Sequence, residues 1–491
     1  MTDTPKIAQA ESRKSIHIVG ICGVATSALA IAFHKKGYFV TGSDKGFYPP
    51  VSTALEDVHI PFYAGWHPEK ITELHHTSPK SLPDFIVAGG SGTSLSNPEI
   101  IFAKEHSVKI LSFAQALGEF FIKKNSIVTV GTWGKTTTSA ILSYIFLQAN
   151  MHPSYFTGGL SLSHDTGALS DSDWSIVEGD EYQAAIWDRQ PKFAYYAPTH
   201  LLLTSVSWDH ADLYPTEKAY FDTFEKLVAK IPHTGVIVYC TDDAGAVTTI
   251  AKMHPLCPTL TYGKKVTTEP QPNYYYHNIS HTKQGISFSI THNNETFELY
   301  SPMLGIYNAD NITGCFAMAH QAGITPDVII NAIAGFKGIK RRLERRYEGP
   351  VTVLDCHAPT PEKAASILES IRDVYHDKII SIFEPNIGGR QRNSIAQYDD
   401  AFKNTDYLYL PRFTKTKIDP NETDRPLEAP ELATYISKKH SHVVYNEDDS
   451  ALIDTAITHA KEGDVIAFLG SHGFRGMIEE TINKLEAKYK K

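Results

Sequence analysis

Short, nearly continuous apolar runs alternate along most of the chain with longer segments of helical character. Many of these runs end in turns that carry glycine, an acidic residue or histidine. Uninterrupted apolar strands are typical of parallel sheets that helices cover on both faces. The pattern therefore predicts an α/β fold built from doubly wound sheets.

The first predicted unit, residues 1–122, opens with a strand, a glycine turn, a helix that reaches about Lys36, and a second strand that ends near Asp44. This order is typical of a Rossmann-like mononucleotide-binding half. Its glycine fingerprint is incomplete, because Ser27 replaces the third glycine. Strands are predicted within residues 16–19, 38–41, 84–90 and 107–113.

The second predicted unit, residues 123–346, is a further α/β domain. Residues 235–300 are expected to alternate strands and loops, and a helix is expected to begin within 305–320. The basic run at 337–346 is interpreted as a boundary. Strands are predicted at 127–130 and within 174–182 and 200–212, and a helix at 139–148.

The third predicted unit, residues 347–491, repeats the alternation of strand and helix and closes with a glycine turn and a final helix. It is predicted to be a second Rossmann-like domain. Its strands are predicted at residues 351–355, 379–384, 407–410, 443–445 and 465–470.

Composition supports a soluble chain of several domains. With about 150 residues per domain, 491 residues suggest about three. The net charge of −9 argues against a dedicated nucleic-acid binder, and five scattered cysteines without a CxxC pair indicate reduced thiols. The chain shows neither a signal peptide nor an apolar run near the roughly 18 residues of a membrane span. We therefore expect a cytoplasmic protein that binds neither nucleic acid nor membrane.

The segment VTVGTWGKTTT (128–138) is the strongest chemical signal. A strand leads into a glycine-containing turn, and a helix follows, so that backbone N–H groups face an anion. Lys135 is placed to reach the outer phosphates of a nucleotide, and the Thr136 hydroxyl is placed to bind Mg²⁺. The spacing is unusual, because Thr129 stands where a phosphate loop has its first glycine. The alternative is an ordinary turn with a surface lysine.

Acidic residues and a histidine follow the next two predicted strands. Because ligands bind outside the carboxyl ends of strands in open α/β sheets, these residues are expected on the rim that carries Lys135. Glu178 is a candidate Mg²⁺ ligand, and His210 a candidate ligand of a second metal. The alternatives are a solvated turn for Glu178 and a buried structural imidazole for His210. The rim residues are Glu178, Asp180, Glu181, Asp209 and His210.

Arginines gather in two later segments, RRLERR (341–346) and EPNIGGRQRNS (384–394). Each guanidinium can grip a carboxylate or phosphate through two parallel N–H bonds. The alternative for the first run is a solvated basic helix end. His357 and His472 also follow strands, and each alone is expected to be structural.

Taken together, these segments resemble the Mur ligase family, the ATP-dependent amide-forming enzymes of peptidoglycan assembly. The resemblance extends from about Ser15 to Lys484. It implies an N-terminal UDP-sugar-binding domain, a central P-loop ATPase domain and a C-terminal Rossmann-like domain for the amino substrate. Its motifs are GICG (20–23), VTGSD (40–44), YPPVST (48–53), GTWGKTTT (131–138), EGDEY (178–182), DHAD (209–212), NADN (308–311), RRLERR (341–346) and HAPT (357–360).

The resemblance also implies roles for individual residues. The UDP-sugar would contact Gly20, Cys22, Gly23, Val24, Ser43 and Asp44. ATP would contact Gly131, Thr132, Gly134, Lys135, Thr136, Thr137, Asn308, Asn311 and Arg342. The metal ligands would be Thr136, Glu178 and His210. The catalytic set is Lys135, Glu178, His210 and His357, and the amino substrate is assigned to Arg390 and Arg392.

The implied reaction phosphorylates the carboxylate of UDP-N-acetylmuramate and then joins it to an amine, in peptidoglycan recycling. The segments YPPVST, EYQAAIWDRQPKF and WDHADLY favour the tripeptide L-Ala-γ-D-Glu-meso-diaminopimelate as amino substrate, with L-alanine as the alternative. A monomer or weak homodimer is expected.

The chain departs from the family pattern at several points. Trp133 and Tyr307 replace histidines, Ser205 and Ser207 replace an asparagine and a glutamate, and the loop at 355–360 has lost one histidine. A nucleotide-binding relative that has lost catalysis is therefore a second hypothesis. A nicotinamide-dependent oxidoreductase is a third, which the incomplete glycine fingerprint disfavours.

Overall fold

The structure is a computed structural model that describes residues 13–47, 49, 51–76, 81–89, 93–210, 212–267, 270–414 and 425–490. Tyr48 and Pro50 of the YPPVST motif and Ala211 of the DHAD motif lie outside these residues. The chain divides into two compact units. Unit 1 comprises Met1–His277, Ile290–Phe297 and Asp310–Ile333, and unit 2 comprises Asn278–Ser289, Glu298–Ala309 and Ala334–Lys491.

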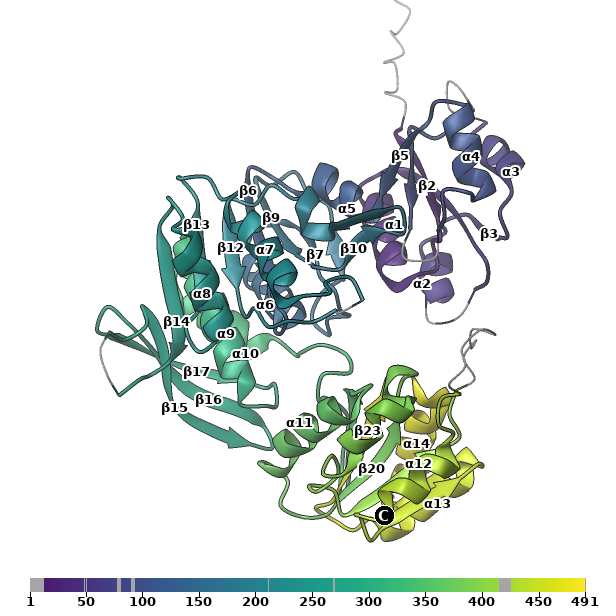
Figure 1. The fold of residues 1–491 in the computed structure, drawn as a ribbon, viewed down its shortest axis with the longest axis vertical. Helices are drawn as coiled ribbons and strands as arrows, with labels where there is room; N and C mark the ends of the chain where they lie inside the picture. The colour runs from purple at the N-terminus through teal and green to yellow at the C-terminus, as the bar shows by residue number, and fades with distance from the viewer. Residues whose placement is uncertain are drawn as a thin grey trace, which may run out of the picture. The chain divides into compact units, whose positions relative to one another are not determined.

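Unit 1 begins with a parallel five-stranded sheet of order β3-β2-β1-β4-β5 (Figure 1). The chain reverses direction across the sheet between β1 and β4, which creates the switch point where ligands bind in open α/β sheets. The strands are β1 (Ser15–Val19), β2 (Phe39–Asp44), β3 (Phe62–Ala64), β4 (Phe85–Ala88) and β5 (Lys109–Ser112). The helices are α1 (Val24–Lys35), α2 (Val51–Asp57), α3 (Pro68–Leu74), α4 (Pro98–Glu105) and α5 (Phe113–Ala116), with a π-helical turn at Leu117–Phe121.

A second parallel sheet in unit 1 carries the phosphate-loop segment. Its strands follow the order β14-β13-β12-β6-β9-β7, and β8 adds an antiparallel edge. Buried apolar side chains fill β6 and β12, because helices flank the sheet (Figure 1). The strands are β6 (Asn125–Val130), β7 (Ser154–Phe156), β8 (Gly167–Ala168), β9 (Trp174–Glu178), β12 (His200–Leu203), β13 (Val236–Cys240) and β14 (Thr259–Lys264).

The remaining elements of this region include a small antiparallel hairpin, β10 (Gln183–Ala185) with β11 (Asp188–Pro191), followed by a 3-10 turn at Lys192–Tyr195. The helices are α6 (Lys135–Gln148), α7 (Glu217–Val228), α8 (Ala244–Met253), α9 (Tyr307–Gln321) and α10 (Pro326–Gly335). Three longer strands are β15 (Tyr274–Thr282), β16 (Gly285–His292) and β17 (Glu295–Ser301).

Unit 2 contains a six-stranded sheet of order β18-β19-β23-β20-β21-β22, in which only β18 is antiparallel to its neighbour. Separate apolar clusters pack on its two faces, as in a doubly wound sheet. The strands are β18 (Glu344–Glu348), β19 (Thr352–His357), β20 (Ile379–Glu384), β21 (Tyr407–Pro411), β22 (Val443–Asn446) and β23 (Val465–Gly470). The helices are α11 (Pro361–Arg372), α12 (Ala429–Ile436), α13 (Asp449–His459) and α14 (Met477–Tyr489), with 3-10 turns at Gly388–Arg390, Arg392–Tyr398 and Phe474–Gly476.

The prediction of an α/β fold with parallel sheets is confirmed, and three local expectations are corrected. Helix α6 begins at Lys135 and not at Ser139, so the phosphate-loop lysine is its first residue. Helix α8 lies where only strands and loops were expected, because Asp243 accepts a hydrogen bond from Ala246 N and caps it. The basic run near 344 is not a helix end, since it forms β18 against β19. No helix among the described residues is long and apolar enough to span a membrane.

Candidate active site

The turn between β6 and α6 has a backbone that only glycine adopts without strain. Gly131 has φ +144° and Gly134 has φ +84°. A Cβ at Gly131 would lie 2.2 Å from Thr204 Oγ1, and one at Gly134 would lie 2.6 Å from Asn311 Oδ1. The turn thus delivers the chain directly to the N-terminus of α6, where backbone N–H groups and the helix dipole favour an anion.

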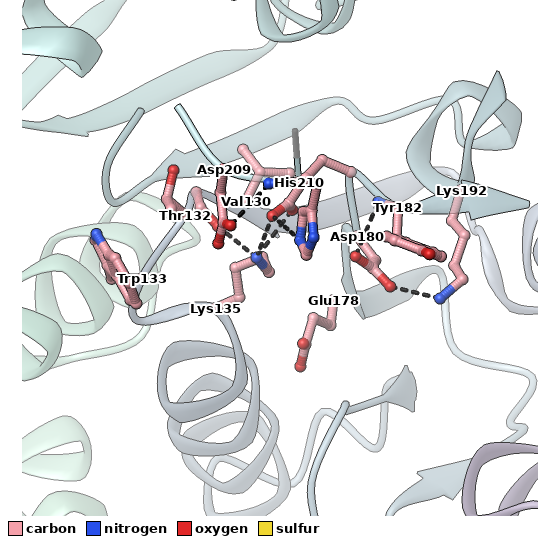
Figure 2. Close-up of polar contacts among 12 residues, drawn as sticks. Val130, Thr132, Trp133, Lys135, Glu178, Asp180, Tyr182, Lys192, Asp209 and His210 are labelled. Carbon is pink, nitrogen blue, oxygen red and sulfur yellow. Dashed lines mark hydrogen bonds and ion pairs between the residues drawn. The ribbon is translucent and has the colours of Figure 1, made fainter. Parts of the chain in front are cut away.

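Lys135 is held over this turn by two groups of the chain. Its Nζ donates to Gly131 O at 2.6 Å and to both carboxylate oxygens of Glu181 at 2.8 and 3.0 Å (Figure 2). Glu181 is 1% exposed, whereas the Lys135 side chain is 14% exposed. The ammonium is therefore pre-positioned beside the anion-binding end of α6.

Glu181 also lies beside His210. His210 Nε2 lies 3.6 Å from Glu181 Oε1, and the Tyr220 hydroxyl donates to the same oxygen at 3.3 Å. The neighbouring Glu181 carboxylate raises the pKa of His210, although burial acts in the opposite direction. His210 has φ +54°, a conformation that strains a non-glycine residue. The sequence placed Glu181 on the rim but predicted no role for it. Its role follows from its burial beside Lys135, which the sequence does not show.

Glu178 has different partners. Its Oε1 accepts from Thr136 Oγ1 at 3.0 Å, and its Oε2 accepts from Gly158 N at 2.6 Å and Ser139 Oγ at 3.2 Å. Burial raises the pKa of Glu178, and the charge of Lys135 only partly offsets that effect. A buried carboxylate beside a threonine hydroxyl offers the hard oxygen ligands that Mg²⁺ prefers.

The proposed metal trio is thus divided between two carboxylates. Thr136 contacts Glu178, whereas His210 is held by Glu181. Among the described residues, a group of three His, Cys, Asp or Glu ligands within reach of one ion occurs elsewhere, at Cys240, Asp242 and Asp310.

Two departures from the family pattern support the phosphate loop from behind. Ser205 Oγ accepts from Trp133 N at 2.9 Å. Thr132 Oγ1 donates to Ser207 O and accepts from Ser207 N, both at 2.8 Å. Thr132 is buried, so its hydroxyl serves the loop, while the Trp133 side chain is 55% exposed. Thr137 is half-buried in the first turn of α6.

The glycine turn after β1 is fixed by the end of β2. Gly20 N and Ile21 N donate to Ser43 O at 2.8 and 3.0 Å, and Cys22 N donates to Asp44 Oδ2 at 2.8 Å. A cavity of about 460 Å³ opens beside this turn. Gly20, Gly23, Val24 and Asp44 line it, together with Trp66, Tyr182, Ala185 and Lys192.

The β10–β11 hairpin links this cavity to the phosphate-loop rim. Tyr182 and Lys192, at the two ends of the hairpin, line the cavity. Lys192 Nζ is paired with Asp180 at 2.5 Å, and Tyr182 packs edge-on against His210 with ring centroids 5.1 Å apart. The hairpin residues that line the cavity therefore also contact the rim around Lys135, and Figure 2 shows Tyr182 and Lys192 beside His210 and Asp180.

The remaining sequence-predicted residues lie in other surroundings. In unit 2, burial and the nearby charges of Arg342 and Arg341 lower the pKa of His357 to about 4, so its ring is neutral at pH 7. Asn308 is buried and donates to Leu304 O at 2.8 Å. Asn311 belongs to unit 1 and faces Gly134.

The two candidate arginines for the amino substrate differ sharply. Arg390 is 4% exposed, its Nε donates to Leu427 O at 2.8 Å, and its NH2 group pairs with Glu428 at 3.0 Å. Its guanidinium also stacks on Phe413. The Arg392 side chain is 56% exposed and lies 3.8 Å from Glu431. Residues of the same chain already bind the guanidinium of Arg390, whereas that of Arg392 is exposed to solvent.

Family models match most of the chain. The model described as "Mur ligase family, catalytic domain" matches residues 15–125. The model described as "Mur ligase middle domain" matches residues 128–319, and "Mur ligase, glutamate ligase domain" matches residues 341–472. Their order agrees with the N-terminal, central and C-terminal domains expected from the sequence.

Two curated relatives have different amino substrates in their names. UDP-N-acetylmuramate–L-alanyl-gamma-D-glutamyl-meso-2,6-diaminoheptandioate ligase of Haemophilus influenzae is 27% identical, over 97% of this chain and 100% of that protein. UDP-N-acetylmuramate–L-alanine ligase of Pelagibacter ubique is 29% identical, over 80% of this chain and 82% of that protein.

Two solved structures share the fold. UDP-N-acetylmuramate-alanine ligase of Thermotoga maritima has a TM-score of 0.75 at 20% identity, covering 96% of this chain and 99% of that one. A murein peptide ligase of Psychrobacter arcticus has a TM-score of 0.67 at 23% identity, covering 96% of this chain and 98% of that one.

Proposed function

This chain belongs to the Mur ligase family, and we propose that it joins UDP-N-acetylmuramate to the tripeptide L-Ala-γ-D-Glu-meso-diaminopimelate in peptidoglycan recycling. It is an ATP-dependent ligase that forms a C–N bond. The choice of tripeptide rests on the Haemophilus influenzae relative, which matches over its whole length and is named for this substrate. The L-alanine enzymes are the alternative.

The observation that carries the proposal is the arrangement of Lys135, Glu181 and His210 beside the N-terminus of α6. A carboxylate is a poor electrophile, and transfer of a phosphoryl group from ATP converts it into an acyl phosphate with a good leaving group. Amine attack on that acyl group gives a tetrahedral intermediate, which collapses with loss of phosphate. Both steps build up negative charge, which fixed cations and backbone N–H groups stabilise.

Each residue of the site has a part in this scheme. Lys135 neutralises the outer phosphates, and the backbone N–H groups at the start of α6 cradle them. Glu181 keeps the ammonium of Lys135 in place, and it fixes the ring of His210. Arg392, exposed beside the 3-10 turn that it opens, is the better of the two candidate arginines for a carboxylate of the peptide.

Mg²⁺ would be held by Glu178 and Thr136, whose oxygens lie 3.0 Å apart at the start of α6. The ion would supply charge neutralisation for the transferred phosphoryl group. The fit is supported by the raised pKa of Glu178, because a buried carboxylate gains most from a cation. To bind a metal as well, the His210 ring would have to leave Glu181.

The UDP-sugar would occupy the cavity of about 460 Å³ between the glycine turn and the β10–β11 hairpin. Lys192 lines this cavity, and Asp180 orients its ammonium group. A carboxylate or phosphate group of the ligand could pair with this ammonium. Cys22 and Ser43 act through their backbone, since Ser43 is buried and burial raises the pKa of the Cys22 thiol to about 11.

The test is phosphate release from ATP with UDP-N-acetylmuramate and a panel of amines: L-alanine, L-Ala-D-Glu and the tripeptide. We expect release to require both the sugar nucleotide and an amine, with the highest kcat/KM for the tripeptide. Equal or better turnover with L-alanine would move the chain to the alanine ligases. No turnover with any amine, together with retained ATP binding, would identify a nucleotide-binding relative that has lost catalysis.

A further inference from the structure

A buried carboxylate lies behind the cavity without lining it. Glu99, in the first turn of α4, has no exposed surface and is absent from the cavity wall. Its Oε1 accepts from the Tyr63 hydroxyl and from His67 N, both at 2.8 Å. Its Oε2 accepts from Ser43 Oγ and lies 3.5 Å from His17 Nε2. One side chain thus joins β1, β2, β3 and the turn before α3.

The bond to Ser43 reaches the glycine wall of the cavity. Ser43 is the residue whose carbonyl accepts the N–H groups of Gly20 and Ile21. The next residue, Asp44, accepts from Cys22 N and itself lines the cavity. Fixing the Ser43 side chain therefore fixes the end of β2, and with it the backbone of the glycine turn.

The bond to His67 reaches the opposite wall. His67 follows Trp66, whose side chain lines the cavity and packs on the small apolar cluster that includes Ile71 and Ile100. The His67 N–H group points to Glu99 and the Tyr63 hydroxyl points to the same oxygen, so the turn from β3 to α3 has one preferred position. This turn carries Trp66.

Burial of the charged Glu99 side chain costs folding free energy unless hydrogen-bond donors compensate its charge. Removal of a carboxylate from water is unfavourable unless several donors replace the lost hydration. Glu99 has two hydroxyl donors, one backbone donor and a histidine, and these together keep its pKa below the ordinary value although burial acts to raise it. A leucine in the same space would leave the His67 N–H group and the hydroxyls of Ser43 and Tyr63 without this acceptor, so the carboxylate holds its donors in place.

We propose that Glu99 is a positioning residue that sets the spacing of the two walls of the nucleotide-sugar cavity. It acts through Ser43 on the glycine turn and through His67 on Trp66. The proposal rests on the proposed function only in naming UDP-N-acetylmuramate as the ligand whose binding it affects. Neither the phosphate loop nor the amino substrate is within its reach among the contacts of the described residues.

The experiment compares the wild type with Glu99→Gln, Ser43→Ala and Tyr63→Phe. The amide of Glu99→Gln fills the same volume but offers one acceptor oxygen in place of two, so it cannot accept from Ser43 and from His67 at the same time. We expect the KM for UDP-N-acetylmuramate to rise at least tenfold in Glu99→Gln and less in Ser43→Ala. The kcat and the KM for ATP should stay within twofold, and Tyr63→Phe should have the smallest effect because it leaves both walls bonded.

The matched control is Asp464→Asn. Asp464 is a carboxylate of unit 2 that is 4% exposed and accepts from Lys378 N and Lys461 N. Its substitution should lower thermal stability without changing the KM for UDP-N-acetylmuramate. Hydrogen exchange supplies a readout that needs no ligand: the amides of Gly20, Ile21 and His67 should exchange faster in Glu99→Gln than in the wild type, and equally in Asp464→Asn.

Unchanged exchange at these three amides and an unchanged KM in folded Glu99→Gln would overturn the inference. If Glu99→Gln does not fold, Ser43→Ala carries the test, and an unchanged KM with unchanged exchange at Gly20 and Ile21 would overturn it. Failure of the wild type to bind UDP-N-acetylmuramate would count against the proposed function alone, because the exchange measurement would still decide the role of Glu99.

Discussion

At the scale of single residues, the ion pair of Lys135 and Glu181 has two consequences, because its carboxylate is buried and its ammonium is nearly so. The sequence predicts that Lys135 binds the outer phosphates of a nucleotide, with a surface lysine of an ordinary turn as the alternative. Without it the buried Glu181 would lose the cation that contacts both of its oxygens and would keep only the Tyr220 hydroxyl and His210 as partners, which is destabilising. Catalysis and folding therefore use the same lysine.

Lys135→Ala is expected to reduce phosphate release at least about a hundredfold, since it removes a cation from the developing charge. It should also lower the melting temperature, in contrast to what a surface lysine would do. The double variant Lys135→Ala with Glu181→Gln should regain much of the lost stability but none of the activity. Near wild-type turnover in the single variant would contradict the phosphate-loop assignment.

Asp310 provides a prediction on pH. Burial, with the nearby charge of Asp242 adding to it, raises its pKa to about 7, and its partner is the Cys240 thiol at 3.5 Å. Since the ordinary pKa of an aspartate is about 3.9, the folded state binds more protons than the unfolded state between about pH 4 and 7. Stability contributed by this group therefore falls as the pH rises through that range.

Asp310→Asn removes this titration and keeps the shape. We expect its melting temperature to exceed that of the wild type by about 2 °C or more at pH 8, and the difference to shrink toward pH 4. Thermal unfolding of both proteins from pH 4 to pH 8 measures it. A difference that is constant across this range would show that Asp310 is ionised in the folded protein.

At the scale of elements, the hydrophobic pattern predicted the buried parallel strands well, because a strand covered on both faces must be apolar throughout. It failed where a single polar contact decides the structure. A linear pattern does not reveal which partner a residue contacts. Two such contacts are the Asp243 cap that starts α8 and the pairing with β19 that makes β18 from a basic run. The pattern also does not show that Thr136 contacts Glu178 whereas His210 lies beside Glu181, and the assignment of these residues to metals remains a prediction.

Helix α12 provides the test of the two candidate arginines. Arg390 binds Leu427 O and Glu428, the residue that caps α12. Arg390→Ala should therefore destabilise the protein by about 2 kcal/mol or more, because it removes the buried hydrogen bonds of the charged guanidinium to Leu427 O and Glu428. Arg392→Ala should leave stability unchanged and raise the KM for the tripeptide. Urea unfolding and steady-state kinetics on both variants separate these effects; a KM effect confined to Arg390→Ala would reverse the assignment.

At the scale of the whole molecule, the resemblance to the Mur ligase family is confirmed by three family models in the expected order. The predicted domain limit at 346/347 remains a prediction, and the contacts in unit 2 favour an earlier start. β18 pairs with β19, and Arg341 donates to the carbonyls of Gly470, Ser471 and His472. These contacts all belong to unit 2.

A fragment of residues 334–491 should consequently be more stable than one of residues 347–491. The shorter fragment loses β18 and the three charge-assisted hydrogen bonds of Arg341, and we expect a loss of about 3 kcal/mol or more. Urea unfolding of the two fragments followed by circular dichroism gives the comparison. Equal midpoints and slopes would restore the limit predicted from the sequence.

The division of the chain into interleaved segments also determines the order in which the ribosome delivers the parts. Asn278–Ser289 and Glu298–Ala309 belong with residues 334–491, but they are synthesised before unit 1 has received its last segment, Asp310–Ile333. These strand-rich segments therefore emerge while most of their own unit does not yet exist. Segments whose packing partners have not yet been synthesised expose apolar surface, which favours aggregation of the nascent chain. Slow translation after residue 309 should accordingly lower the yield of folded protein, and a chaperone that shields extended segments should restore it.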